Sequence, residues 1–378
     1  MRYVDGMAEA DDDIDSTVLE RTLTNEELDD LVAPEATATS VTFSTQDFDV
    51  AGLVTRLKRG SMLVPSFGHE DERITSAGFQ RGFVWSKAQM DRFVESLLLG
   101  YPIPGIFLVR QSTDNRLLVL DGQQRLVTLR RFYEGMHQGR EFKLENVGVE
   151  FRGLTYESLD DALRFKLDDS YLQATIVHAD GSDEVNDAVY QIFERLNAGG
   201  TQLTPHEIRV ALYAGPFIDL LERLNTLSSW RVLYGKKSAR IRDQELVLRI
   251  LALFAESASY ARPLKAFLNR FVAAHRMQDG VVDQAGALFE RAAERLAEIG
   301  PRVMRRPGGG QVNMAQAEAV FVAVMEGLQQ GALASDLGAA IDQLVADDGF
   351  TSATTRATAD KDAVTARLDL ARRRLVRR

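Results

Sequence analysis

The stretch Leu117-Leu118-Val119-Leu120-Asp121-Gly122-Gln123-Gln124-Arg125 is the most informative guide to the fold of this chain. Four consecutive apolar residues are followed by five polar or small ones, and apolar residues then return at helical intervals from Leu126 to Phe132. The short apolar run predicts a buried strand, and the later spacing predicts a helix. The polar cluster is therefore expected where a strand ends and a helix begins.

That position favours binding of an anion, because the first N–H groups of a helix lack internal partners and carry the positive end of its dipole. Arg125 adds a planar set of donors suited to phosphate oxygens, and Gln123 and Gln124 add amides that a core does not need. The structural alternative is that Asp121 caps the helix, which is worth about 0.5 to 2 kcal/mol, and that Gly122 serves only the turn.

The acidic residues are concentrated at the start of the chain. The 378 residues carry a formal charge of −10, but residues 1–50 hold 14 acidic and 2 basic residues. The remaining 328 residues are close to neutral, with 43 basic and 41 acidic side chains. The overall acidity therefore does not argue against binding of phosphate or nucleic acid by the rest of the chain.

The absence of cysteine excludes disulfides and thiolate metal sites, and it agrees with a reducing compartment. The acidic N-terminus does not resemble a secretory signal, and no stretch reaches the 18 or so apolar residues needed to span a membrane. These features predict a soluble, cytoplasmic protein without a membrane partner.

Three regions are expected along the chain. Residues 1–45 are predicted to form a mobile acidic arm, 46–200 an α/β domain, and 201–378 a helical domain with a basic end at Arg367–Arg378. The fold class is thus α+β. Helices are predicted at Phe48–Leu57, Ser86–Gly100, Leu126–Phe132, Val189–Leu196, Val247–Phe254 and Val320–Leu328, and strands at Met62–Val64, around Ile74, at Gly105–Val109, Leu117–Leu120 and Tyr171–His178.

The domain boundary near residue 201 rests on a change of pattern. Two glycines follow Asn197, and Thr204, Pro205 and Glu207 then form the signature of a capping box with proline at the first helical position. Almost all later signals are helical. Arg305–Gly310, which contains three consecutive glycines, is expected to be a loop between helices.

Two further pairs of polar residues are candidates for the same site. Gln80 and Arg81 precede a glycine and aromatic residues, and Arg195 and Asn197 lie at the end of a predicted helix. The alternatives are an arginine packed over an aromatic ring and ordinary helix capping.

Four basic residues before a predicted helix, Lys236, Lys237, Arg240 and Arg242, are candidates for contact with DNA phosphates. The alternative is a solvated charged surface.

The sequence offers little for nuclease chemistry. The five histidines are scattered, at positions 69, 137, 178, 206 and 275. Glu141 and Lys143 are expected on one side of a strand and, with Asp121 upstream, weakly match metal-dependent nucleases. The phosphate-loop signature Gly-x-x-x-x-Gly-Lys-Ser/Thr is absent.

Five blocks in this order resemble the N-terminal domain of GmrSD-type modification-dependent restriction systems, a family formerly of unknown function and related to ParB and sulfiredoxin. The resemblance runs from about residue 50 to 270. The blocks are Gln80-Arg81-Gly82-Phe83-Val84-Trp85, Tyr101-Pro102-Ile103-Pro104, Asp121-Gly122-Gln123-Gln124-Arg125, Phe193-Glu194-Arg195-Leu196-Asn197 and Leu203-Thr204-Pro205-His206-Glu207-Ile208-Arg209.

The resemblance implies a ParB/sulfiredoxin-like fold and a role in defence against phage DNA. It associates Asp121 to Arg125 with binding and hydrolysis of a nucleoside triphosphate, with Mg²⁺ as the expected ion. Arg81 and Arg125 would hold phosphates, Asp121 would orient the ion or a water bound to it, and a glutamine would position the attacking water.

Many relatives carry a second domain with a histidine nuclease motif, and residues 271–378 lack one. A partner nuclease is therefore expected for DNA cleavage. The alternative to hydrolysis is a switch that responds to nucleotide or DNA by binding alone.

Overall fold

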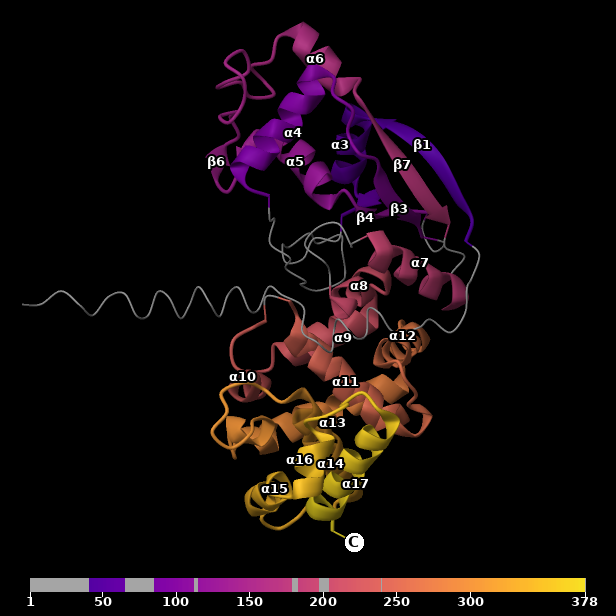
Figure 1. Cartoon of the computed structure of the whole chain (residues 1–378), viewed down its shortest axis with the longest axis vertical. Coiled ribbons are helices and arrows are strands. Elements are labelled where there is room, and N and C mark those ends of the chain that lie inside the picture. Colours follow the sequence, from indigo (N-terminus) through magenta and orange to yellow (C-terminus); the bar gives the residue numbers. More distant parts are fainter. Residues whose placement is uncertain are drawn as a thin grey trace, which may run out of the picture. The chain divides into compact units, whose positions relative to one another are not determined.

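The computed structural model describes residues 41–64, 85–111, 115–178, 183–196, 204–238 and 240–377 (Figure 1). Most of the predicted acidic arm, the predicted strand around Ile74, and the candidates Gln80, Arg81 and Asn197 lie outside the described residues.

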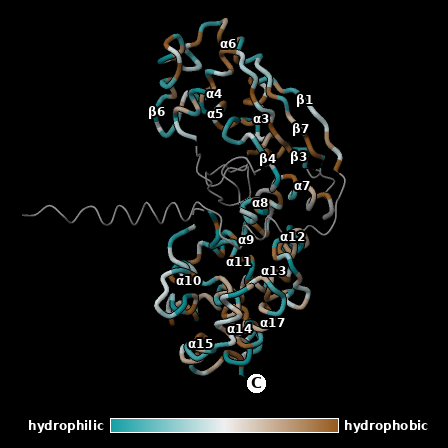
Figure 2. The backbone as a smooth tube through the Cα atoms, viewed as in Figure 1, coloured by the Kyte–Doolittle hydropathy of each residue, from teal (hydrophilic) through white to brown (hydrophobic). Residues whose placement is uncertain are grey.

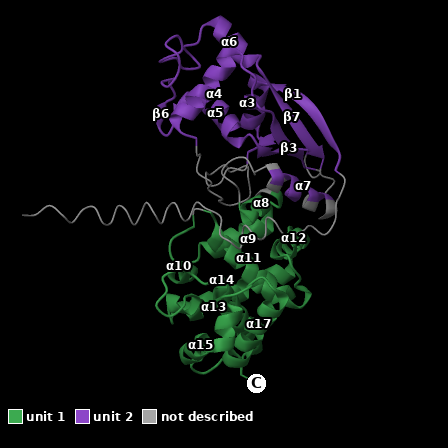
Figure 3. Ribbon diagram, in the orientation of Figure 1, with its two compact units in different colours: residues 1–34, 74–78, 203–378 green, residues 35–73, 79–202 purple. Residues whose placement is uncertain are grey.

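The chain divides into two compact units (Figure 3). The described part of the first extends from Val41 to Leu196 and combines helices with a mixed sheet. The described part of the second, from Thr204 to Arg377, is built from helices. The predicted fold class, a mixed α/β region followed by a helical region, is therefore confirmed.

A five-stranded sheet organises the α/β unit, with the order β1-β7-β3-β4-β2. The β1–β7 and β3–β4 pairs are antiparallel, whereas β7–β3 and β4–β2 are parallel. A separate two-stranded sheet pairs β5 with β6. The strands are β1 Phe43–Asp49, β2 Met62–Leu63, β3 Ile106–Arg110, β4 Leu117–Asp121, β5 Met136–His137, β6 Arg140–Glu141 and β7 Tyr171–His178.

The helices of this unit are α3 Val50–Arg59, α4 Lys87–Leu99, α5 Gln123–Glu134, α6 Asp161–Asp168 and α7 Asp183–Leu196. The bounds of α4 follow directly from its sequence. Ser86 and Gln89 form a capping box at its start, and Gly100 ends it in the left-handed region, with φ 81°. The prediction for Ser86–Gly100 is confirmed.

The strand β4, which lies between β3 and β2 in the sheet, is buried on both faces. Leu117 and Val119 belong to the core cluster that includes apolar residues of α3, α4 and α5, and these helices lie on one side of the sheet (Figure 1). Because side chains alternate along a strand, Leu118 and Leu120 face the other side, where α7 contacts β4. Figure 2 shows brown stretches along β3 and β7 and a paler β1, in keeping with the exposed residues of β1.

The second unit contains ten α-helices among its described residues and is centred on α14, which contacts α11, α13 and α17. Most side chains of α11 and α14 are buried. The helices are α8 Pro205–Leu212, α9 Pro216–Asn225, α10 Ser228–Tyr234, α11 Arg242–Glu256, α12 Leu264–Ala274, α13 Gly280–Ala297, α14 Met314–Gln330, α15 Leu337–Val345, α16 Asp348–Ala353 and α17 Lys361–Leu375.

Polar residues of α8 are buried in this unit and paired. Thr204 and Glu207 form the predicted capping box. The Glu207 carboxylate also accepts two hydrogen bonds from the guanidinium of Arg240, both at 2.9 Å. His206 Nε2 lies 3.0 Å from Gln244 Oε1 on α11. These bonds thus hold α8 against α11 and against Arg240, which lies just before α11. The groups that make them would be costly to bury unpaired.

No helix in the described part of the chain is long and apolar enough to cross a membrane.

Burial of His206 predicts that stability falls below neutral pH. Burial lowers the pKa of His206 from 6.5 to about 3, and the charge of Glu245 opposes that shift. As pH falls, the imidazole takes up a proton in the unfolded chain before it does so in the folded chain. The contribution of neutral His206 to the free energy of unfolding is therefore fully present above pH 6.5. It is lost as pH falls towards the folded pKa of about 3, by up to about 1.4 kcal/mol per pH unit. Urea unfolding between about pH 7 and pH 5, followed by Trp230 fluorescence in a Trp85→Phe background, measures this slope.

The slope of the unfolding free energy against pH gives the number of protons taken up on unfolding. His206→Gln is expected to lower that number by up to about one, whereas His178→Gln, on β7, is expected to leave the slope unchanged. An unchanged slope in His206→Gln would contradict the assignment.

Candidate functional site

Glycine is required at the junction between β4 and α5. Gly122 is the residue before α5 and has φ 93°, a backbone conformation that other residues rarely adopt. A Cβ atom there would also overlap the side chain of Ile106 on β3. The predicted turn role of Gly122 is therefore confirmed, and close packing against β3 adds a second reason for it.

The register of β4 changes just before this turn. Leu108 of β3 pairs with Val119, but Phe107 pairs with Asp121, so Leu120 has no counterpart in β3. Such a bulge bends a strand and re-aims the side chains beside it. Here Leu120 stays buried while Asp121 is exposed at the end of the strand.

Among the residues that the structure describes, no side chain caps the start of α5. The first backbone hydrogen bond of the helix joins Leu126 N–H to the Gly122 carbonyl at 3.0 Å. The alternative interpretation of Asp121 as the helix cap is therefore wrong, because Gly122 takes that position and Asp121 belongs to the strand. The uncapped start keeps the positive end of the helix dipole next to an exposed carboxylate.

The guanidinium of Arg125 connects three parts of the junction. Its Nη2 donates to Asp121 Oδ2 at 2.7 Å, one helical turn back. Its Nη1 donates to the carbonyl of Pro104 and, at 3.1 Å, to that of Gly105. The segment before β3, the end of β4 and the start of α5 are thus held together by one side chain.

The two members of the Asp121–Arg125 ion pair differ in exposure. The Arg125 side chain is 12% exposed, whereas that of Asp121 is 51% exposed. Burial lowers the pKa of the Arg125 guanidinium, and the Asp121 charge and hydrogen bond oppose the shift. Arg125 is consequently engaged with protein oxygens, and Asp121 is the charged group of the pair that faces solvent.

The two glutamines make contacts on either side of the junction. Gln123 Nε2 lies 3.4 Å from the carbonyl of Val119 on β4. Gln124 Oε1 accepts a hydrogen bond from the backbone N–H of Trp85 at 3.3 Å. The Trp85 ring in turn meets Phe93 of α4 edge to face, with ring centroids 5.5 Å apart. Gln124 therefore fixes the residue that ends the first of the five sequence blocks.

The structure thus brings three blocks together through described residues: Trp85, Pro104 and the segment Asp121–Arg125. The fourth block is partly described. It lies at the end of α7, which contacts β4, and its Arg195 is exposed.

The predicted basic run does not form one exposed patch. Arg240 is buried against Glu207. Lys237 is exposed but pairs with Glu222 at 2.8 Å, and Lys236 is exposed. Arg242 is half-buried at the first position of α11. Lys236 and Lys237 are thus the two members of this run with exposed side chains.

Glu141 and Lys143 pair with each other at 2.8 Å, and both are about half exposed. Hydrogen bonding to Glu141 raises the pKa of Lys143. Glu141 belongs to the small β5–β6 sheet, whereas Asp121 belongs to the five-stranded sheet. Within the described residues, no group of three or more His, Asp or Glu is placed to hold a metal ion.

Three contributors to the site were missed from the sequence: the carbonyls of Pro104 and Gly105 and the N–H of Trp85. Backbone groups carry no residue signature. The sequence blocks that contain Trp85 and Pro104 could nevertheless be recognised in the sequence.

These features define a mixed α/β domain with a polar strand-to-helix junction, followed by a helical region. Residues 66–214 match the model of the GmrSD restriction endonuclease, N-terminal domain, and this part of the chain belongs to that family. The chain thus contains a GmrSD-type N-terminal domain in less than half of its length. The matched range is narrower than the predicted 50–270 and includes α8. No curated protein and no solved structure matches the chain.

The contacts of Arg125 predict that it stabilises the junction. Arg125→Ala leaves two carbonyls and the Asp121 carboxylate without this partner, which is expected to cost about 1 to 3 kcal/mol. Amide hydrogen exchange is expected to quicken in peptides that cover β3, β4 and the start of α5.

Arg152→Ala is the matched control, because Arg152 is an exposed arginine of the same unit. Exchange at the junction that is equally slow in Arg125→Ala and in the unmodified protein would contradict this role.

Proposed function

We propose that this chain binds and hydrolyses a nucleoside triphosphate at the β4–α5 junction, as the nucleotide-dependent component of a restriction-type defence system. The observation that carries the proposal is the uncapped start of α5 beside the exposed carboxylate of Asp121, held in place by Arg125. Membership of residues 66–214 in a restriction endonuclease domain family supports the setting.

The start of α5 supplies the attraction for phosphate. Its twelve residues form three turns, whose aligned peptide dipoles place partial positive charge at the first N–H groups. Since no described side chain caps them, phosphate oxygens would meet these donors directly. Gly122 makes the left-handed turn from which α5 starts, and so it sets the position of these N–H groups at the end of β4.

Asp121 is the residue proposed to hold Mg²⁺. Proteins bind this ion through one or two carboxylates together with phosphate oxygens and water, and an exposed carboxylate beside a phosphate position fits that donor set. A bound Mg²⁺ would neutralise charge on the phosphates during transfer.

Arg125 is proposed as a positioning residue, because its donors already meet Asp121 and two carbonyls. It would hold the Asp121 carboxylate in one orientation and fix the turn at Gly122. Contact of Arg125 with phosphate would require it to exchange these partners.

The amides of Gln123 and Gln124 would orient the water that attacks the terminal phosphorus, as a glutamine does in other phosphoryl-transfer sites. Gln80, Arg81, Arg195 and Asn197 are proposed to complete the nucleotide site.

The helical unit is proposed to contact DNA or a partner nuclease. Lys236 and Lys237 have exposed ammonium groups suited to DNA phosphates, and the half-buried Arg242 follows them. Arg240 is proposed to hold the segment that contains Lys236 and Lys237 in place through its buried ion pair with Glu207, without contacting DNA itself. Cutting would be supplied by a separate nuclease subunit.

A binding switch without meaningful hydrolysis is the second candidate. The observation in its favour is that the one carboxylate of the junction is already paired with Arg125, with no acidic cluster around it among the described residues. Nucleotide binding would then alter the junction and its partners without turnover.

Phosphate release from the purified full chain, with each triphosphate and Mg²⁺ and with or without DNA, tests the proposal. Asp121→Asn keeps the shape of the side chain but removes its charge, and is expected to lower turnover by about 100-fold or more. Gln123→Ala is expected to lower turnover while nucleotide binding is retained.

Asp169→Asn provides the control, since Asp169 is an exposed aspartate of the same unit, and turnover is expected to be unchanged. Triphosphate binding without phosphate release would favour the switch. Full turnover in Asp121→Asn would rule out the proposed role of the junction.

A further inference from the structure

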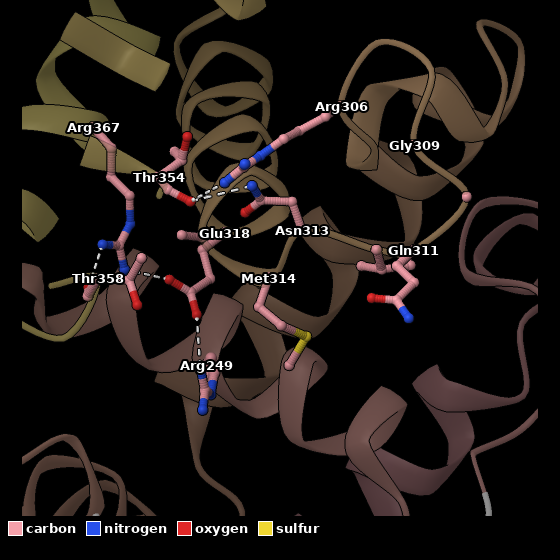
Figure 4. A pocket seen from close by; sticks show the side chains of 13 residues that line it. Arg249, Arg306, Gly309, Gln311, Asn313, Met314, Glu318, Thr354, Thr358 and Arg367 are labelled. Atoms are coloured by element: carbon pink, nitrogen blue, oxygen red, sulfur yellow. Dashed lines mark hydrogen bonds and ion pairs between the residues drawn. The ribbon is translucent and has the colours of Figure 1, made fainter. Parts of the chain in front are cut away.

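The helical unit contains a pocket of about 520 Å³ outside the residues matched to the restriction endonuclease domain (Figure 4). Its lining comes from α11, α14, α17, the segment Thr354–Thr358 and the glycine-containing loop before α14. The volume lies within the range of about 300 to 1,000 Å³ that is typical of small-molecule sites. It is thus large enough for a molecule of nucleotide size.

Three arginines and one carboxylate line the pocket: Arg249, Arg306, Arg367 and Glu318. Glu318 of α14 is buried between Arg249 of α11 and Arg367 of α17 and pairs with both. Arg249 also donates to Glu245 at 3.0 and 3.1 Å. The charges of the pocket floor are therefore balanced and fixed in position.

Within the described part of the chain, one donor of this floor has no partner. Nε of the buried Arg367 makes no hydrogen bond, although Nη1 donates to the carbonyl of Thr358 and Nη2 pairs with Glu318. A buried polar group without a partner is costly, so the floor holds one unsatisfied donor.

Arg306 supplies positive charge at the rim. Its side chain extends over the pocket towards Thr354 (Figure 4), where Nη2 donates to the backbone carbonyl at 3.2 Å. Arg306 is exposed, and no carboxylate of the described residues pairs with it. Because the floor is balanced, Arg306 gives the whole pocket an excess of positive charge.

The loop Arg305–Gly310 beside the pocket is held by hydrogen bonds of Arg305. It also contains one glycine, Gly310, that the fold does not require. Arg305 donates to the carbonyls of Gly310, Leu233 and Tyr234 and so ties the loop to the end of α10. Gly308 needs its glycine because φ is 74°. Gly310 has no left-handed φ, and a Cβ atom there would meet nothing within 4 Å. Glycine in an open position is typical of backbone that a ligand approaches closely.

We propose that this pocket binds a phosphate monoester of mononucleotide size, with the phosphate between Arg306 and the Gly309–Gly310 backbone and the organic part inside. The bidentate donors of arginine suit phosphate oxygens, and loop N–H groups can supplement them. Met314 and Ala315 provide apolar surface for the part of the ligand without charge. This site is separate from the β4–α5 junction and would let a second small molecule regulate the chain.

Calorimetric titration of the full chain with adenosine 5′-monophosphate tests the proposal, with adenosine and inorganic phosphate as partial probes. Arg306→Ala removes the rim charge, and Gly310→Val adds bulk where the fold has room. Each variant is expected to weaken binding at this pocket by about tenfold or more. Phosphate release at the β4–α5 junction in the absence of the monophosphate is expected to be unchanged, which separates the two sites.

Arg302→Ala is the control, since Arg302 is an exposed arginine four positions away that pairs with Asp342 at 3.3 Å. It is expected to bind the monophosphate as the unmodified chain does. The proposal is overturned if Arg306→Ala and Gly310→Val, shown to be folded by thermal melting, both bind normally. It is also overturned if adenosine binds as tightly as its monophosphate, or if short duplex DNA binds through Arg306 while the monophosphate does not.

Discussion

The arrangement of the β4–α5 junction in the α/β unit depends on the guanidinium of Arg125. One planar group meets the exposed carboxylate at the end of β4 and two carbonyls just before β3, and it does so from the first turn of α5. Because the group is mostly buried, the loss of any partner is expensive, so the three segments are fixed relative to one another. The bulge at Leu120 leaves Asp121 exposed at the end of β4, and Gly122 takes the capping position of α5 without a side chain.

Much of the fold could be predicted because its signals are local. The apolar spacing and caps of Ser86–Gly100 specify α4, and Thr204 with Glu207 specifies the start of α8. Two of the three partners of Arg125 could not be predicted, since they are backbone carbonyls 21 and 20 positions away and depend on strand pairing. The bulge at Leu120 depends on the same pairing.

The sequence positions of charged residues also do not reveal which of them are buried in ion pairs. The run from Lys236 to Arg242 suggested a basic surface, yet Arg240 is buried in an ion pair with Glu207, 33 positions earlier, which also takes part in the capping box of α8. A single carboxylate thus serves both a local cap and a distant ion pair. In the pocket of the helical unit, Glu318 likewise pairs with two arginines that are distant in sequence, Arg249 and Arg367, so that Arg306 sets the local charge.

The central claim is that the Asp-Gly-Gln-Gln-Arg segment binds phosphate through the start of α5 and Asp121, with Arg125 holding the junction. The most direct measurement is a crystal structure of the chain with Mg²⁺ and a non-hydrolysable triphosphate. The account predicts phosphate oxygens at the first N–H groups of α5, the ion beside Asp121, and Arg125 still bonded to the carbonyls of Pro104 and Gly105. Triphosphate bound away from this junction, or Arg125 turned from those carbonyls to the phosphate, would contradict it.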